Sequence, residues 1–283
     1  MFVIREACSQ DGDSGYTAGG FVRPASRGER KAMQGLITAF RTLTVLPVPG
    51  RDSEDFAASL PWFPVIGLIL GVLLALAGGL WDRFLGTWFE GAACLLLAGS
   101  ILLTRGLHLD GLADWADALG GRPEREVRLA ILKDSSLGAF GGLALGMVLL
   151  LKWVALVRLL SIGAIGWIVP ALIVSRTMMA ELTATLPYAR SGPGTAGPFV
   201  QGATGRRRIA ALVVGFALAL AWGLPGILCF ALGWLGTRVF SRHCRATFGG
   251  VTGDLLGSLN ELLETGLLFL LCGLPWGGVL WYS

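Results

Sequence analysis

The fold is decided by residues 60–81, which read LPWFPVIGLILGVLLALAGGLW and carry no charge. At about 1.5 Å per residue, a helix of this length crosses a hydrocarbon core about 30 Å thick. The chain of 283 residues has the same character, since 54% of it is hydrophobic, 15% is charged and its mean hydropathy is +0.67. Such a composition is typical of an all-α, polytopic protein of the lipid bilayer rather than of a soluble domain.

Five more apolar stretches follow this first one. Lys152 lies close enough to the end of its stretch to snorkel toward water, whereas Arg176 lies inside its own. The stretch at 209–237 is broken by GLPG at 223–226, so it is either one long span or a hairpin of two short ones. The five stretches are residues 84–104, 137–157, 159–182, 209–237 and 255–281.

The distribution of basic residues decides between these two topologies. With the basic N-terminus inside, the loops at 105–136, 183–208 and 238–254 are the arginine-rich ones. The positive-inside rule places all three in the cytoplasm only if residues 209–237 form a hairpin. We therefore predict about seven transmembrane helices, a cytoplasmic N-terminus and an external C-terminus with an interfacial belt of Trp276, Trp281 and Tyr282.

The N-terminal segment differs in composition from the rest. Residues 1–32 are polar, basic and rich in Gly and Ser, without the apolar core of a signal peptide. They are interpreted as a flexible basic tail or, alternatively, as sequence upstream of a true start at Met33. Residues 33–283 then form one helical membrane domain, which opens with helical spacing over 34–46 before a proline-rich turn. The cysteines are widely spaced and are assigned no function.

Three carboxylates follow the second apolar stretch at helical spacing. Asp110, Asp114 and Asp117 stand at i, i+4 and i+7, so on a helix they crowd one face. Crowding of this kind is unfavourable unless a cation sits among the carboxylates. Mg²⁺ is the usual cation where carboxylates meet a phosphate-bearing substrate. The alternative is a solvated amphipathic turn, which the membrane context disfavours.

A lysine and hydroxyl groups precede a glycine-rich helix start in the third stretch. Lys133 and Ser135 come shortly before Gly138, where backbone N–H groups at a helix N-terminus can hold a phosphate. An ordinary N-cap followed by small residues for tight helix packing explains the pattern equally well. The motif by itself leaves both interpretations open.

A second glycine-rich segment, GGVTGDLLG at 249–257, begins the last stretch. It delivers Asp254 at the mouth of a span, with Glu261 and Glu264 on the same helical side. Capping explains Asp254 alone, but carboxylates inside a membrane are costly and generally functional. The segment is therefore a candidate for completing a metal or diphosphate site. The Pro- and Gly-rich loop at 188–198 is either a lid or a linker.

Taken together, these motifs resemble the signatures of the cobalamin synthase family, also called adenosylcobinamide-GDP ribazoletransferases. The resemblance covers about residues 33–269, in order. It rests on LHLDGLAD at 107–114, KDS at 133–135 with Leu137 and Gly138, GVTGD at 250–254 with Gly257, Glu261 and Glu264, LPVP at 46–49, Phe63-Pro64 with Gly67 and Gly71, and Ser175-Arg176.

The resemblance implies a Mg²⁺-dependent transferase of the bacterial inner membrane whose active site faces the cytoplasm. It implies the joining of adenosylcobinamide-GDP to α-ribazole or its 5′-phosphate, with release of GMP, at the last assembly stage of vitamin B12. In that reaction a ribose hydroxyl of the acceptor attacks the phosphorus attached to cobinamide. Bound Mg²⁺ would neutralise charge on the diphosphate and on the departing phosphate.

On the same basis, individual residues are given roles. The predicted metal ligands are Asp110, Asp114, Asp117 and Asp254. The attacking proton would pass to His108 or to an acidic residue such as Asp114, with a purely structural His108 as the alternative. Lys133 and Arg105 are predicted to clamp phosphate oxygens. The remaining predicted substrate contacts are Ser135, Gly138, Thr252 and Gly253.

Two other functions remain open. A CDP-alcohol phosphotransferase also uses aspartates with a divalent metal, but its signature has Asp-Gly-x-x-Ala-Arg where this chain has Asp-Gly-Leu-Ala-Asp at 110–114. A secondary transporter would line an ion path with Arg176, Glu261 and Glu264, although no inverted repeat is visible.

The sequence also bears on macromolecular partners. Arginines that set the topology explain the net charge of +4, so no nucleic-acid partner is expected. The glycine-rich spans permit close helix pairing within or between protomers, which is compatible with a homo-oligomer.

Overall fold

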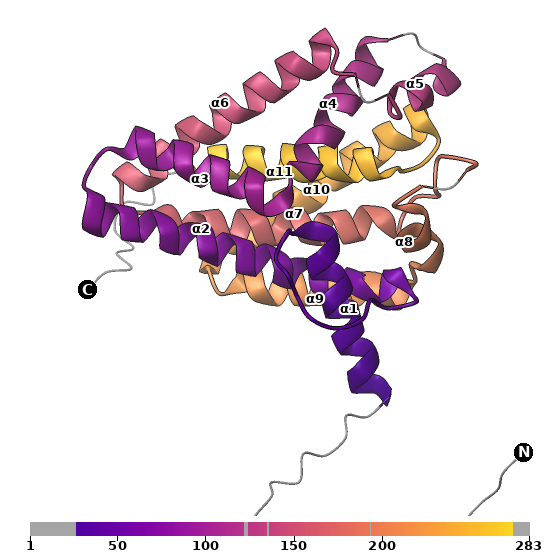
Figure 1. Ribbon diagram of the computed structural model, residues 1–283, viewed down its shortest axis with the longest axis horizontal. Helices are drawn as coiled ribbons and strands as arrows, with labels where there is room; N and C mark the ends of the chain where they lie inside the picture. The colour runs from indigo at the N-terminus through magenta and orange to yellow at the C-terminus, as the bar shows by residue number, and fades with distance from the viewer. Residues whose placement is uncertain (1–26, 122–123, 135, 193, 274–283) are drawn as a thin grey trace, which may run out of the picture.

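The structure, a computed structural model, describes residues 27–121, 124–134, 136–192 and 194–273 (Figure 1). In this part of the chain the secondary structure is helical, and the only β pairing is an isolated bridge between Tyr188 and Val251. The all-α prediction is therefore confirmed. The predicted aromatic belt and most of the predicted 1–32 tail lie outside the described residues, and helix α1 begins at Arg27.

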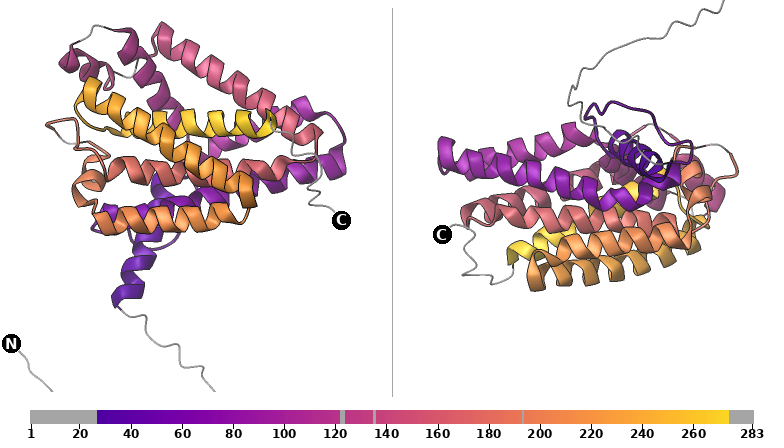
Figure 2. Two further views of the ribbon diagram at one scale, coloured as in Figure 1. Left: turned by 180° about the vertical axis from the view of Figure 1, so that it is seen from behind. Right: turned by 90° about the horizontal axis from the view of Figure 1, so that it is seen from below.

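The longer helices run side by side along one axis, which is horizontal in Figure 1 and is seen from other directions in Figure 2. They are α2 (Phe63–Leu85), α3 (Phe89–Thr104), α6 (Ala139–Ser161), α7 (Ile168–Thr183), α9 (Gly205–Leu220), α10 (Gly223–Phe248) and α11 (Gly253–Gly273).

The remaining elements lie from the middle of the bundle toward its right-hand end in Figure 1, apart from η2 (Ile165–Trp167), which connects α6 to α7. The elements in this region are α1 (Arg27–Leu43), η1 (Phe56–Trp62), α4 (Leu107–Gly120), α5 (Arg125–Ile131) and α8 (Gly197–Gly202). This end of the bundle carries the polar motifs identified in the sequence.

Among the described residues, five helical segments are long and apolar enough to cross a membrane. They comprise η1 with α2, α6, η2 with α7, α10, and α11. Helices α3 and α4 add a sixth if their 89° bend belongs to one broken span. Large apolar side chains such as Leu76, Leu143 and Leu235 face outward, as expected in lipid. The membrane character is thus confirmed, while seven spans and a cytoplasmic N-terminus remain predictions.

Residues 209–237 do not form one continuous helix. Helix α9 ends at Leu220 and α10 begins at Gly223, whose φ of +61° reverses the chain so that the two helices pack together. This is the hairpin that the charge pattern favoured. The predicted loop at 238–254 is wrong over most of its length, because α10 continues to Phe248. Hydropathy detects only the apolar part of a helix, whereas the last part of α10 is rich in arginine and is still helical.

Helix α7 is the centre of the bundle. Every one of its residues is buried, and it packs against α2, α9, α10 and α11. Its two charged side chains therefore need partners within the protein. Glu181 forms a bidentate pair with Arg208 of α9, at 2.6 and 2.8 Å, and lies 3.3 Å from Arg238 of α10. Arginines that the sequence analysis used only for topology thus also join three helices.

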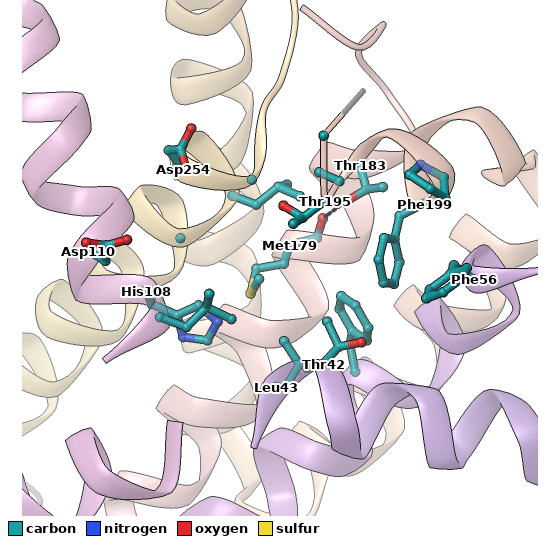
Figure 3. Close-up of a pocket in the computed structure, with 18 residues that line it drawn as sticks. Thr42, Leu43, Phe56, His108, Asp110, Met179, Thr183, Thr195, Phe199 and Asp254 are labelled. Atoms are coloured by element: carbon teal, nitrogen blue, oxygen red, sulfur yellow. Dashed lines mark hydrogen bonds between the residues drawn. The ribbon is translucent and has the colours of Figure 1, made fainter. Parts of the chain in front are cut away.

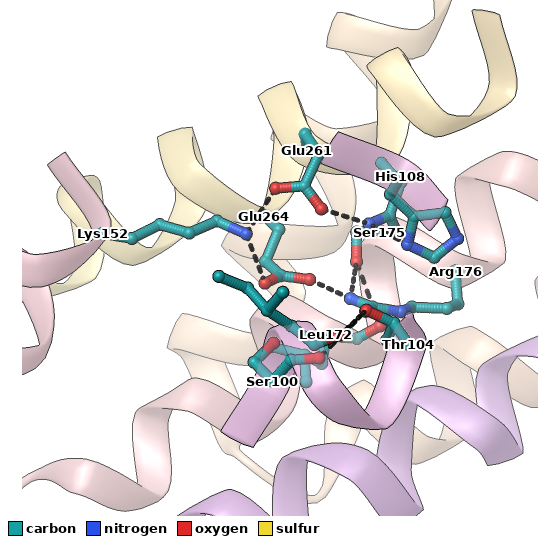
Figure 4. Close-up of polar contacts among 11 residues, drawn as sticks. Ser100, Thr104, His108, Lys152, Leu172, Ser175, Arg176, Glu261 and Glu264 are labelled. Carbon is teal, nitrogen blue, oxygen red and sulfur yellow. Dashed lines mark hydrogen bonds and ion pairs between the residues drawn. The ribbon is translucent and has the colours of Figure 1, made fainter. Parts of the chain in front are cut away.

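The other charged residue of α7, Arg176, belongs to a cluster of four buried charges between α6, α7 and α11 (Figure 4). Lys152 Nζ lies 2.6 Å from Glu261 Oε2 and 2.8 Å from Glu264 Oε1, and Arg176 also pairs with Glu264. Two positive and two negative charges balance, as a site away from water requires. The prediction that Lys152 snorkels toward water is wrong, because its ammonium group turns inward to the two glutamates.

Replacement of Glu264 by Gln is expected to lower the stability of the fold by about 3–5 kcal/mol, because Arg176 would lose its carboxylate partner in the interior and Lys152 would keep only Glu261. Thermal unfolding of the purified protein in detergent measures the loss. Glu90→Gln, at an exposed position in the first turn of α3, is the matched control and should leave the melting temperature unchanged. Equal melting temperatures for the two variants would contradict a stabilising role for the cluster.

Candidate active site

The bend between α3 and α4 directs the acidic motif into the protein. Arg105 and Gly106 have φ values of +55° and +64°, and α4 leaves α3 at 89°. A left-handed backbone ends one helix and redirects the chain. Arg105 is the only non-glycine residue with positive φ in the part of the chain that the structure describes. Helix α4 then packs against α6 and α11.

Two glycines allow α4 and α11 to approach each other closely. A Cβ atom on Gly111 would lie 2.6 Å from the carbonyl oxygen of Asp254, and one on Gly257 would lie 3.1 Å from Cα of His108. Ser258 Oγ donates a hydrogen bond to the Gly111 carbonyl at 2.9 Å. Side chains at these glycines would push the helices apart. The close contact therefore places the acidic face of α4 beside Asp254.

Asp117 caps the N-terminus of α6. Its Oδ2 accepts a hydrogen bond from the Gly138 N–H and its Oδ1 accepts one from the Gly141 N–H, both at 2.8 Å. A carboxylate in this position satisfies free N–H groups and the positive end of the helix dipole. The helix start, for which the sequence left a phosphate site and an ordinary N-cap open, is thus capped by this carboxylate, and both Asp117 oxygens accept hydrogen bonds from α6.

The other three predicted metal ligands form an acidic group. Asp110 and Asp254 line one cavity (Figure 3). Asp114 lies outside the five candidate spans, and burial, followed by the charges of Asp110, Asp254 and Asp117, raises its pKa to about 7. Surplus negative charge of this kind favours binding of a cation. Among the described residues, no three His, Cys, Asp or Glu side chains form a group that could hold a metal ion by themselves.

Arg190 and Thr252 hold Asp254 in place. Arg190 Nη2 donates to Asp254 Oδ2 at 2.8 Å and also to the Leu132 carbonyl at 2.8 Å, and Thr252 Oγ1 lies 3.2 Å from the same carboxylate oxygen. Arg190 Nε is buried and has no hydrogen-bond partner in the structure described. The sequence analysis counted Arg190 only among the basic loop residues. The one sequence feature that could have indicated a role for Arg190 in the site is its position in the Pro- and Gly-rich loop at 188–198.

That loop is fixed to the α10–α11 connection at its beginning. The Ala189 N–H donates to the Val251 carbonyl at 3.0 Å, and the Val251 N–H donates to the Pro187 carbonyl at 2.9 Å. Arg125 of α5 adds hydrogen bonds to the carbonyls of Phe248 and Ala189, at 2.8 and 3.2 Å. The later part of the loop, from 194 to 198, contributes to the wall of the cavity.

The cavity beside Asp110 and Asp254 has a volume of about 510 Å³ and a mostly apolar wall (Figure 3). Phe199 contacts Phe56 and Phe63, with ring centroids 5.5 and 6.3 Å apart. Further apolar wall comes from Leu43, Met179, Pro198 and Leu256. An apolar compartment with a few polar groups at one end is the usual form of a small-molecule site.

His108 also lines this cavity and is only 2% exposed. Its Nδ1 lies 3.0 Å from Nδ2 of Asn260 on α11. Its Nε2 is buried without a hydrogen-bond partner among the described residues. One ring nitrogen thus makes the structural contact between α4 and α11, and the other has no hydrogen-bond partner in the described part of the protein.

The remaining predicted residues lie in different places. Thr252 and Gly253 flank Asp254, and Gly253 lines the cavity. Arg105 is exposed, but it shares a neighbouring opening of about 720 Å³ with Asp110. Lys133 is exposed in the connection between α5 and α6 and is absent from the cavity wall. Ser135 lies outside the described residues.

Comparison with known proteins matches the chain to one family model and to curated relatives that share one name. The family model described as cobalamin-5-phosphate synthase matches residues 35–272. Curated relatives called adenosylcobinamide-GDP ribazoletransferase include one from Chlorobaculum parvum, 46% identical over 84% of this chain and 94% of its own. The relative from Chlorobaculum tepidum is 44% identical over 88% of this chain and 98% of its own. The relative from Pseudomonas paraeruginosa is 39% identical over 84% of this chain and 98% of its own. No solved structure matches the chain.

Asp117→Ala is expected to lower the melting temperature, because loss of a helix cap costs about 1–2 kcal/mol. Mg²⁺ should still raise the melting temperature of this variant as much as that of the unmodified protein. Differential scanning fluorimetry with and without Mg²⁺ measures both effects. Glu126→Ala, at an exposed position on α5, is the control. If the melting temperature without Mg²⁺ were unchanged and Mg²⁺ no longer raised it, Asp117 would be a metal ligand rather than a helix cap.

Proposed function

Because the chain belongs to the cobalamin-5-phosphate synthase family, we propose how its residues carry out one phosphoryl transfer. The protein is a membrane transferase that joins adenosylcobinamide-GDP to a ribazole acceptor and releases GMP, in the final step of vitamin B12 assembly. The observation that carries this conclusion is the identity of 46% to a named relative across 84% of the chain. Neither a CDP-alcohol phosphotransferase nor a transporter gains support from the comparisons.

Asp110 and Asp254 would hold Mg²⁺, and Asp114 would add negative charge beside them. The residues fit this ion, because Mg²⁺ usually takes one or two protein carboxylates and completes its shell with water and substrate phosphates. Since no three His, Cys, Asp or Glu side chains of the described residues form a group that could hold a metal ion, water and substrate phosphates would have to complete the shell. The surplus negative charge around Asp114 favours a cation at this place. When bound, Mg²⁺ neutralises charge on the diphosphate and on the leaving phosphate.

Arginine side chains would bind the phosphates that the carboxylates repel. Arg190 is held by Asp254 and Leu132, so its unpartnered Nε–H has a fixed position beside the acidic group. A preorganised donor of this kind stabilises charge that develops on a phosphate oxygen. Arg105 shares an opening with Asp110 and would bind a more exposed phosphate, such as a 5′-phosphate on the acceptor.

The acidic group, the cavity and most of the arginines lie at one end of the bundle, which we assign to the cytoplasmic side of a bacterial inner membrane. The support is the charge pattern, since Arg125, Arg190, Arg242 and Arg245 lie on the connections or helix ends that surround this end. Nucleotide substrates in the cytoplasm would then reach the site without crossing the bilayer.

The test is turnover by the purified protein in liposomes, supplied with adenosylcobinamide-GDP, α-ribazole and Mg²⁺. We expect cobalamin and GMP to form in equal amounts, and EDTA to abolish the reaction. Chromatography of the corrinoids and nucleotides measures both products. Supplying the 5′-phosphate of α-ribazole as acceptor should give cobalamin 5′-phosphate. No corrinoid product from folded protein would contradict the proposed function.

In the same assay, Asp254→Asn should lower kcat/KM by at least about 100-fold, which corresponds to about 2.7 kcal/mol of lost transition-state stabilisation. Asp82→Asn is the control, because Asp82 is exposed near the far end of α2. Full activity of the Asp254 variant at saturating Mg²⁺ would remove Asp254 from the metal site.

A further inference from the structure

We propose that the apolar cavity is the pocket for the heteroaromatic base of the acceptor, and that His108 donates an Nε2–H hydrogen bond to the free ring nitrogen of this base. The inference rests on the proposed function and goes beyond it by assigning a substrate to the cavity. It also gives His108 a role other than the general base suggested by the sequence.

The cavity has the size and character of a pocket for a small apolar ring system. Its volume of about 510 Å³ is within the range of about 300–1,000 Å³ that is usual for small-molecule sites. The contacts of Phe199 with Phe56, edge-on, and with Phe63, tilted, provide an aromatic wall for the base of α-ribazole, a flat benzimidazole that carries two methyl groups. A corrin with its ring of amide side chains is much larger and more polar. The cavity therefore suits the acceptor rather than the donor.

The polar ends of the cavity define how the acceptor would be oriented. Asp110 and Asp254 lie at one end of the view in Figure 3, whereas Phe56 and Phe199 lie at the other. A nucleoside with its base against the phenylalanines has its ribose directed toward the carboxylates, where the phosphoryl group is transferred. The opposite orientation would bring the apolar base against two acidic groups.

The contacts of Glu261 and Asn260 indicate which nitrogen of His108 carries the proton. Glu261 Oε2 is paired with Lys152 (Figure 4), and Glu261 Oε1 lies 3.4 Å from Asn260 Nδ2. A carboxylate only accepts hydrogen bonds, so the amide of Asn260 turns its NH₂ group toward it. The same NH₂ group then donates to His108 Nδ1 at 3.0 Å. With the amide in this orientation, Nδ1 accepts and the ring proton is on Nε2.

A protonated Nε2 is a donor, whereas a general base needs an unprotonated nitrogen. Nε2 is buried and has no partner in the described part of the protein, which is unfavourable unless a ligand supplies an acceptor. The base of α-ribazole is a benzimidazole that is joined to ribose through one ring nitrogen. Its second ring nitrogen is then the only hydrogen-bond acceptor of the ring. The unpartnered donor on the protein thus matches the single polar atom of the base.

The test compares His108→Gln and His108→Ala in the liposome assay, with both substrates varied. Gln places an N–H donor close to the position of Nε2, whereas Ala removes it. The acceptors are α-ribazole and the corresponding riboside in which a C–H group replaces the free ring nitrogen.

We expect His108→Ala to raise the KM for α-ribazole about 10-fold to 100-fold, with the KM for adenosylcobinamide-GDP unchanged. His108→Gln should restore the KM for α-ribazole to within about threefold of the unmodified protein. The unmodified enzyme should prefer α-ribazole to the C–H analogue, and His108→Ala should lose that preference. Phe199→Ala should raise the KM for both acceptors, which tests the pocket even if His108→Ala fails to fold.

Equal loss of kcat in His108→Gln and His108→Ala, with KM unchanged, would overturn the donor role and support a general base. An unchanged KM for both acceptors in Phe199→Ala would overturn the pocket assignment while leaving the proposed function intact. A lack of cobalamin formation by the unmodified protein would overturn the proposed function itself.

Discussion

The structure depends on the balance of buried charge between α6, α7 and α11. Lys152, Arg176, Glu261 and Glu264 are all buried, and each is neutralised by another member of the group. In a membrane interior an unpaired charge is costly, so these three helices can pack in only a few relative positions. Asn260 extends the network to His108 and thereby fixes α4 as well. Charges remote from the reacting groups thus set the position of the acidic motif.

The functional end of the bundle is built on irregular backbone. The left-handed residues at the α3–α4 bend, the close contact of α4 with α11 and the fixed loop after α7 bring Asp110, Asp254 and Arg190 together from distant parts of the chain. Regular spanning helices supply a rigid frame, and the bends between them carry the chemistry.

Sequence alone predicted the helical class, the α9–α10 hairpin and the motifs that meet at the site, because hydropathy, charge asymmetry and helical spacing are local properties. It misjudged Lys152, whose partners lie more than a hundred positions away on α11. Spacing placed Asp117 on the acidic stripe but could not show that it caps α6. Arg190 was overlooked as a site residue because its ion pair with Asp254 depends on tertiary contacts. Long-range pairing, rather than local pattern, was the missing information.

The most direct measurement is electron paramagnetic resonance of Mn²⁺, as a spectroscopic substitute for Mg²⁺, bound to the purified protein with adenosylcobinamide-GDP. A catalytic metal held by Asp110 and Asp254 predicts one tightly bound Mn²⁺ per chain in the unmodified protein and loss of that signal in Asp110→Asn and Asp254→Asn. Undiminished Mn²⁺ binding in both variants, with folded protein and bound substrate, would contradict a metal site at these two carboxylates.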